Sequence, residues 1–185
     1  MRVAQRIFTK GKVVLVVALF AWGVELGVEA GERLIIADGK IAIELPRGWE
    51  ETELNADNPD VLAGYATEDQ HSSIFFQALD PGSTGTMQGL LHGTIANFDE
   101  TFEMTRVDDE VTGEVRGVDQ KWPAIFCTAE GIVEKGTDEF AMRFYLLVFD
   151  TGTGLYFVQA STTLPVRQAS ESEIYELIRS IVAKS

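Results

Sequence analysis

Few side chains in this sequence could carry out covalent or acid–base chemistry. The chain has one cysteine, Cys127, and two histidines, His71 and His92. Cys127 lies in the apolar run 125–129, on the same side as Ile125 if that run is a strand. A nucleophilic thiol needs an electropositive, partly exposed setting, which this run does not supply. We therefore predict that Cys127 is a buried core thiol, and a single cysteine allows no disulfide within the chain.

His92 is the residue around which an enzyme would most readily be built. Helical spacing places four residues on the less apolar face of its segment: Gln88, His92, Ala96 and Asp99. A metal held by His92 and Asp99 would have two protein ligands two turns apart, whereas zinc usually takes three or four. His71 falls in a polar turn, where we expect exposure to solvent. We favour a solvated helix face over a metal site.

The acidic run Asp108-Asp109-Glu110 carries the oxygen ligands that calcium prefers. It could form a site with Asp138 or Glu139 if the loops converged, but the spacing matches no calcium-binding loop. The sequence also lacks the G-x-S-x-G, G-x-x-x-x-G-K-[ST] and G-x-G-x-x-G motifs. We predict no catalytic residue, no cofactor and no metal, and hence a protein that is not an enzyme.

Two tryptophans are candidates for a binding surface. Trp49 and Trp122 each lie at the end of an expected strand, beside Gly48 and Pro123 respectively. Aromatic rings in such places can line the rim of a ligand or partner site. The alternative is that each ring covers one end of the core, and this alternative is favoured.

The elements that would position these residues are mostly strands. Asp38-Gly39 between two apolar runs predicts a hairpin. The run 139–149 is apolar on both faces, so other elements should cover it on both sides. An apolar stripe predicts an amphipathic helix near 86–102, and a second predicts a C-terminal helix near 170–184 that begins with a capping box from Ser170 to Glu173.

These elements predict an α/β (α+β) fold. We expect an α/β/α sandwich with a mainly antiparallel sheet of about six to eight strands. The length after residue 30 suits a single domain over 31–185.

The first thirty residues have the pattern of an export signal. Four basic residues precede the apolar run 13–24, which is shorter than the roughly 20 residues of a spanning helix. Val28 and Ala30 suit cleavage after Ala30. We predict a signal peptide over 1–30 and a periplasmic or extracellular protein; the alternative is an uncleaved anchor.

The charge of the chain restricts its partners. It carries 15 basic and 29 acidic residues, a net charge of −14, and removal of the first thirty residues would make the balance more negative. Such a surface repels nucleic acid and anionic lipid. It favours cationic partners or divalent cations, or it simply keeps the protein in solution, and this last interpretation is preferred. No second apolar run reaches spanning length, so we expect no membrane insertion after cleavage of the signal.

The order of these elements resembles a known family. An early apolar strand closes as Leu45-Pro46-x-Gly48-Trp49, a helix and a long meander follow, and the chain ends in the pattern Glu-Ile-x-x-Leu-Ile-x-Ser-Ile over 173–181. This is similar to the Mog1/PsbP-like fold and, within it, to small exported bacterial proteins of the DcrB type. The family includes a binder of a nuclear GTPase and a photosystem II subunit, so the resemblance implies a binding or accessory module.

The functional expectation follows from these points. We expect an exported, non-catalytic binding or accessory module at the bacterial envelope, with an unknown envelope protein or small ligand as partner. One alternative is a small-ligand or lipid carrier with a cavity between helix and sheet. A less favoured alternative is a hydrolase or metal-dependent enzyme that uses His92 and nearby carboxylates.

Overall fold

The computed structural model describes residues 32–52, 60–79, 85–135 and 138–184. The predicted signal peptide over 1–30 lies outside these ranges, as does most of the polar stretch 50–60. Within the described ranges, neither helix is long and apolar enough to cross a membrane.

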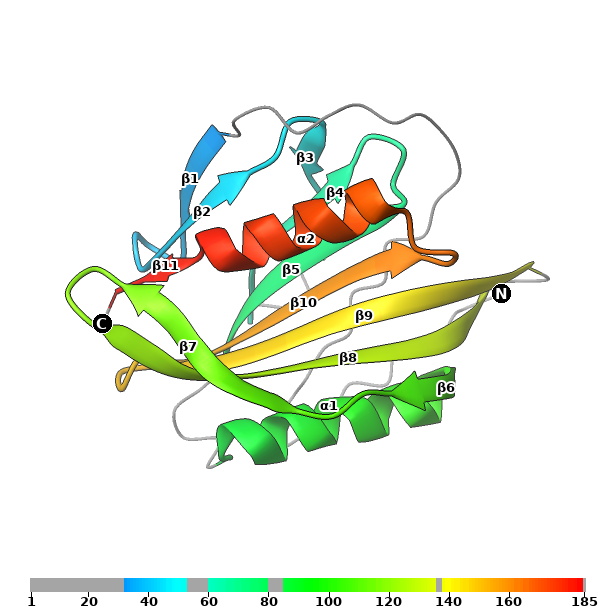
Figure 1. The fold of residues 1–185 in the computed structure, drawn as a ribbon. Helices are drawn as coiled ribbons and strands as arrows, with labels where there is room; N and C mark the ends of the chain where they lie inside the picture. The colour runs from blue at the N-terminus through cyan, green and yellow to red at the C-terminus, as the bar shows by residue number, and fades with distance from the viewer. Residues whose placement is uncertain (1–31, 53–59, 80–84, 136–137, 185) are drawn as a thin grey trace.

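The described residues form eleven strands and two helices (Figure 1). The strands are β1 (Glu32–Ile36), β2 (Ile41–Leu45), β3 (Trp49–Glu51), β4 (Val61–Thr67), β5 (Ser72–Leu79), β6 (Glu103–Val107), β7 (Val111–Gly117), β8 (Lys121–Lys135), β9 (Asp138–Asp150), β10 (Leu155–Thr163) and β11 (Val182–Ala183). The helices are α1 (Met87–Thr101) and α2 (Gln168–Ser180). The prediction of six to eight strands was therefore too low, because β3 and β11 are too short to give an alternating pattern.

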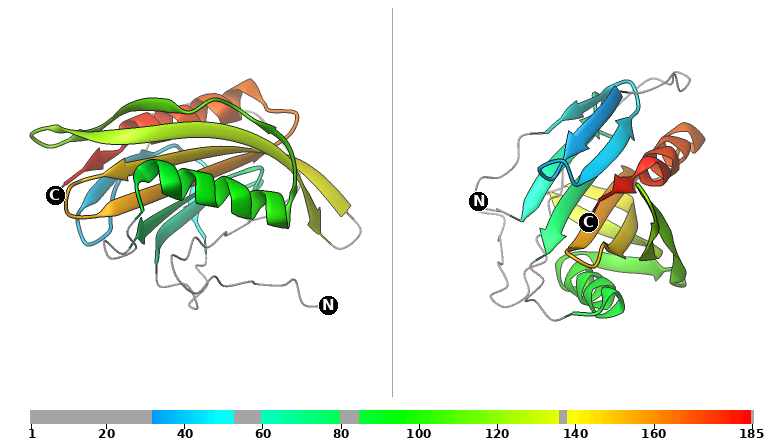
Figure 2. Two further views of the ribbon diagram at one scale, coloured as in Figure 1. Left: turned by 90° about the horizontal axis from the view of Figure 1, so that it is seen from below. Right: turned by 90° about the vertical axis from the view of Figure 1, so that its left-hand side faces the viewer.

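All eleven strands belong to one curled sheet (Figure 2). Its order is β1-β2-β11-β7-β8-β9-β10-β5-β4-β3, and β6 pairs with β8 beside this path. Every pair is antiparallel except β11–β7, which is parallel, so the sheet is mixed. Asp38-Gly39 does connect a hairpin: β1 and β2 pair up to Ile36 and Ile41.

The two helices cover opposite faces of the sheet, with α2 above and α1 below in Figure 1. Strand β9 supplies both cores, as its two apolar faces predict. Phe144, Leu146 and Val148 belong to the cluster under α1, whereas Tyr145 and Leu147 belong to the cluster under α2. Burial on both faces agrees with the apolar run 140–149 of this strand, in which Arg143 is the only charged residue.

Helix α1 agrees with its predicted stripe. Its N-cap residue Thr86 accepts a hydrogen bond from the Gly89 backbone N–H at 3.0 Å. Leu91 and Phe98 are fully buried against the sheet, and the Phe98 ring lies 4.8 Å from that of Phe144. His92 lies beside this buried stripe, and its side chain is 57% exposed.

Helix α2 differs from its prediction at both ends. It begins at Gln168 after Arg167, which makes no side-chain cap hydrogen bond, so Ser170 lies inside the helix and not at its cap. It also ends at Ser180 and not near residue 184. Val182 and Ala183 form β11 instead, because they pair with β2 on one side and β7 on the other.

Candidate functional site

A groove of about 590 Å³ lies between α1 and β6. Helix α1 contributes one wall and β6 with the residues that follow it contributes the other, while Cys127 of β8 lies at the floor. We call it the α1–β6 groove. Its lining residues are His92, Ile95, Ala96, Asp99, Met104, Thr105, Arg106, Val107, Asp108, Glu110 and Cys127.

An extra residue in the sheet edge shapes one wall of the groove. Strands β6 and β7 lie one after the other along the same edge of β8, where Val107 pairs with Ala129 and Val111 pairs with Phe126. The edge advances by four residues from Val107 to Val111 while β8 advances by three from Ala129 to Phe126. The edge therefore contains one extra residue, which forms a β-bulge at 108–110. Because of the bulge, the side chains of Asp108 and Glu110 turn to opposite faces of the sheet, although a regular strand would place them on one face.

Glu110 connects the bulge to α1. One of its carboxylate oxygens accepts a hydrogen bond from the Gln88 side-chain amide at 3.1 Å. The other contacts Nε2 of His92. The helix face predicted to carry Gln88 and His92 is thus the face that borders the groove, and these contacts fix the separation of its two walls.

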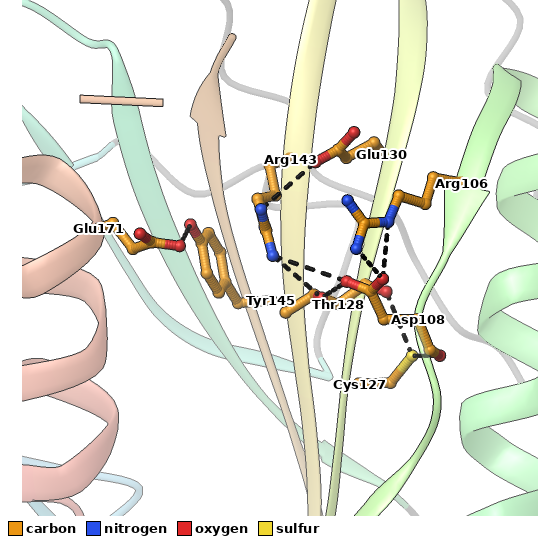
Figure 3. Close-up of polar contacts among 8 residues, drawn as sticks. All are labelled: Arg106, Asp108, Cys127, Thr128, Glu130, Arg143, Tyr145 and Glu171. Carbon is orange, nitrogen blue, oxygen red and sulfur yellow. Dashed lines mark hydrogen bonds and ion pairs between the residues drawn. The ribbon is translucent and has the colours of Figure 1, made fainter. Parts of the chain in front are cut away.

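The side chain of Asp108 lies on the other face of the sheet from that of Glu110, where it contacts Thr128 and Arg143 (Figure 3). Its carboxylate accepts a hydrogen bond from the Thr128 hydroxyl, and its backbone N–H donates to the Thr128 carbonyl at 2.9 Å. Arg106 forms an ion pair with it at 2.6 Å and Arg143 a longer one at 3.6 Å. The Thr128 hydrogen bond lowers the pKa of Asp108, and the two arginines add to this effect against the opposing effect of burial.

Arg143 continues this polar network toward α2. It contacts Glu130 at 3.4 Å, and its guanidinium lies 5.8 Å from the centre of the Tyr145 ring. The Tyr145 hydroxyl in turn donates to Glu171 of α2 at 3.3 Å. The network therefore links the edge of the sheet with the helix on its far face (Figure 3).

Cys127 is buried, as predicted, with 1% of its surface exposed. Its thiol donates to the backbone carbonyl of Asp108 at 3.2 Å. Burial raises the pKa of this thiol, and the nearby charges of Glu110, Asp108 and Asp109 raise it further. The protonated thiol is a poor nucleophile.

The two tryptophans lie far from the groove and each fastens neighbouring elements together. Trp49 is 6% exposed, and its indole N–H donates to Glu173 of α2 at 3.1 Å. The half-buried Trp122 donates to the Ala183 carbonyl of β11 at 3.3 Å. These positions favour the alternative that each ring covers one end of the core.

The other candidate residues do not converge. Asp138 pairs with Lys135, seven residues along β8 from Thr128, which is roughly 23 Å at the usual rise of a strand. It is therefore too far from Asp108 to share a calcium ion. His71 bonds to Thr163 at 2.7 Å and contacts Arg167 at 3.2 Å, on another side of the molecule. Among the described residues no three metal-binding side chains cluster.

One residue of this network stands out in the sequence. Arg143 is the only charged residue inside the apolar run 140–149, and a charge in a two-sided buried strand requires partners. Thr128 gave no such signal, because a threonine is ordinary in a strand. The bulge that unites these residues depends on pairing between distant segments.

Comparison with known proteins shows a likeness of shape without a likeness of sequence. The sequence matches no protein-family model and no curated protein at a significant level. Among solved structures, the Ran-binding protein Mog1p of Saccharomyces cerevisiae has a TM-score of 0.55 at 10% identity, over 84% of this chain and 95% of that chain. The cyanobacterial PsbP (CyanoP) of Synechocystis also has a TM-score of 0.55, at 12% identity, over 89% and 98%.

A third similar solved structure is that of a mycobacterial protein. LpqN of Mycobacterium tuberculosis, which is involved in cell envelope biogenesis, has a TM-score of 0.52 at 10% identity, over 85% of this chain and 92% of that chain. The narrower resemblance to DcrB-type proteins stays a prediction. Similarities at this level of identity establish the fold alone, and they show that this chain has the Mog1/PsbP-like fold.

Proposed function

We propose that this protein is an exported, non-catalytic binding or accessory module that acts at the bacterial envelope. The observation that carries this proposal is the α1–β6 groove, which is open at the surface. Contacts of Glu110 with Gln88 and His92 connect its two walls. Binding sites are usually preformed concave surfaces of this kind. A fold neighbour involved in envelope biogenesis supports the location.

The construction of the groove supports binding more than catalysis. Glu110 and Asp108 hold the bulge from opposite faces of the sheet, so the β6 wall is rigid. Rigid walls reduce the entropy lost when a partner binds. The groove's one thiol, that of Cys127, has a raised pKa and already donates to a backbone carbonyl.

A second candidate function is a carrier of a small ligand or lipid. The groove lies between a helix and the sheet, where the carrier hypothesis expects a cavity. Its volume of about 590 Å³ falls within the roughly 300–1,000 Å³ of small-molecule sites. The two candidates differ in the mass of whatever occupies the groove in the cell.

Photo-crosslinking in the native host separates these candidates. Benzoylphenylalanine would replace Ala96, an exposed groove residue, and in a control it would replace Glu100, an exposed residue of the same helix outside the groove. A protein adduct from position 96 alone supports an accessory module, and a small added mass supports a carrier. Equal labelling at both positions would contradict a binding role for the groove.

Two further measurements test the remaining parts of the proposal. The intact mass of the protein from the envelope fraction should correspond to a chain that begins at Gly31; a full-length mass would contradict cleavage of the signal. His92→Ala keeps the Gln88–Glu110 hydrogen bond between the two walls of the groove, so it should leave the position-96 adduct in place. If it abolished the cellular role of a folded protein, a hydrolase or metal-dependent enzyme would replace the binding module as the better explanation.

A further inference from the structure

The α1–β6 groove combines apolar and acidic surfaces in a way that restricts its occupant. Ile95 and Met104 are half-buried in its walls, and Val107 beside them is 47% exposed. Asp99 and Glu110 lie on the walls around this apolar surface. We propose that the groove receives a lysine or arginine side chain carried by an extended basic segment of a partner protein. This proposal rests on the binding role proposed above and names the chemistry of the partner.

The apolar part of the groove suits the stem of such a side chain. Lysine and arginine bury their methylene groups along apolar surface and keep the charged group at a polar boundary. Ile95, Met104 and Val107 would contact the stem. A short acidic or amide side chain could not cover this surface and reach past it.

The charges around the groove suit the cationic end. Asp99 is exposed and forms no ion pair with any described residue. Arg106, the groove's arginine, is already neutralised by Asp108 through contacts of 2.7 and 2.6 Å. An incoming guanidinium or ammonium group therefore meets uncompensated negative charge at Asp99.

The buried thiol at the floor lies near the same acidic side chains. The charges of Glu110, Asp108 and Asp109 add to the effect of burial and raise the pKa of Cys127. A field that disfavours the thiolate is one that favours a cation at the same place.

The form of the edge indicates binding through side chains and not through addition of a strand. Besides the bulge at 108–110, the pairing of β6 with β8 shifts between Met104 and Arg106. Two irregularities in so short an edge interrupt the row of backbone groups that an added strand would use. The net charge of −14 would attract a basic segment and raise its rate of association.

A peptide titration of the purified full-length protein tests this proposal. The probe is a fluorescent seven-residue peptide, Gly-Lys-Val-Lys-Val-Lys-Gly with blocked ends, and the readout is fluorescence anisotropy. The control peptide has glutamate in place of each lysine. We expect saturable binding of the lysine peptide, weakened by salt, and no binding of the glutamate peptide.

Matched variants locate the peptide on the protein. Asp99→Asn should weaken binding about threefold to fivefold, as expected for loss of one exposed ion pair, whereas Glu100→Gln removes a neighbouring charge outside the groove and should leave Kd unchanged. Ala96→Trp fills the groove and should weaken binding at least about tenfold. Equal effects of Asp99→Asn and Glu100→Gln would overturn the proposal, because binding would then follow net charge alone.

Other occupants give distinct results that also overturn the proposal. Spermidine that displaced the peptide at a comparable concentration would indicate a small-amine site. A dimer in sedimentation analysis that Ala96→Trp dissociated would indicate a second copy of this chain. If crosslinking at position 96 captured a protein in cells but no lysine peptide bound, the proposed function would stand and only the basic character of the partner would be wrong.

Discussion

The centre of the sheet and its β6–β7 edge are both built from paired strands, but they differ in burial and in the regularity of their pairing. In the centre, β9 is buried on both faces and its pairing with β8 is continuous from Ala124 to Lys135. At the edge, the pairing with β8 is irregular, the side chains are mostly exposed, and charged residues decide the local geometry. Apolar packing therefore sets the stability of this fold, whereas a few polar contacts set the shape of its groove.

Substitutions in the centre of the sheet should destabilise the protein most. Phe144→Ala should lower the free energy of unfolding by about 3–5 kcal/mol, because it leaves a cavity among the rings of Phe98 and Phe102. Urea denaturation measures this change. Phe144→Leu serves as the control and should cost clearly less, and equal losses for both would show that packing volume is not what matters there.

Replacing a glycine by alanine should have different effects in the packed part of the sheet and at its exposed edge. Gly64→Ala in β4 would place a Cβ 2.6 Å from the Phe75 ring and should cost about 1–3 kcal/mol. Gly113→Ala in the exposed edge meets nothing within 4 Å and should be neutral or stabilising by up to about 1 kcal/mol. Thermal unfolding compares them directly, and a reversed order would contradict the distinction between centre and edge.

Thr128→Val breaks the contact that joins the edge to the centre. It removes the hydroxyl that donates to Asp108 and should lower the free energy of unfolding by about 1 kcal/mol. It should also raise the pKa of Asp108 toward its ordinary value of 3.8. Carboxyl-carbon NMR titration measures this pKa, and an unchanged value would mean that the arginines alone hold the carboxylate ionised.

The same carboxylate makes stability depend on pH. Because the folded-state pKa of Asp108 is lowered, its contribution is fully present above pH 3.8 and is lost as the pH falls through the folded-state value. Asp69 behaves likewise: burial opposes its ionisation, but Thr67, His71 and Arg167 lower its pKa overall. Asp108→Asn should therefore show a shallower loss of stability on acidification than the wild-type protein.

The smallest expected effect is at the exposed edge itself. Val111 is 59% exposed, so Val111→Thr should change the free energy of unfolding by less than about 0.5 kcal/mol. Chemical denaturation beside the Phe144 variants provides the check. A loss above 1 kcal/mol would show that the edge contributes to the core after all.

Much of the fold could be predicted from the sequence because it depends on local periodicity. The apolar residues on both faces of 139–149 predicted a strand buried on both sides, and the stripe from Met87 to Phe102 predicted α1. The C-terminal stripe failed at its end, because Val182 and Ala183 follow the helical pattern yet pair with two distant strands. Partners that lie far away in sequence overrode a local preference.

The candidate site could be predicted only in part. The face shared by Gln88, His92, Ala96 and Asp99 follows from helical spacing, and three of these residues line the groove. The opposite orientations of Asp108 and Glu110 do not follow from the sequence, because they depend on how 108–110 aligns with β8.

The bulge at 108–110 also determines where the chain tolerates a change of length. Removing Asp109 would leave one residue fewer opposite β8 and a regular ladder, with Asp108 and Glu110 now adjacent and still on opposite faces. Removing Thr112, only three positions later, would shift the rest of β7 by one and invert the face of every residue after it. The effect of a deletion along this edge therefore depends on its position, because loss of Asp109 restores a regular pairing whereas loss of Thr112 changes which face the following residues occupy.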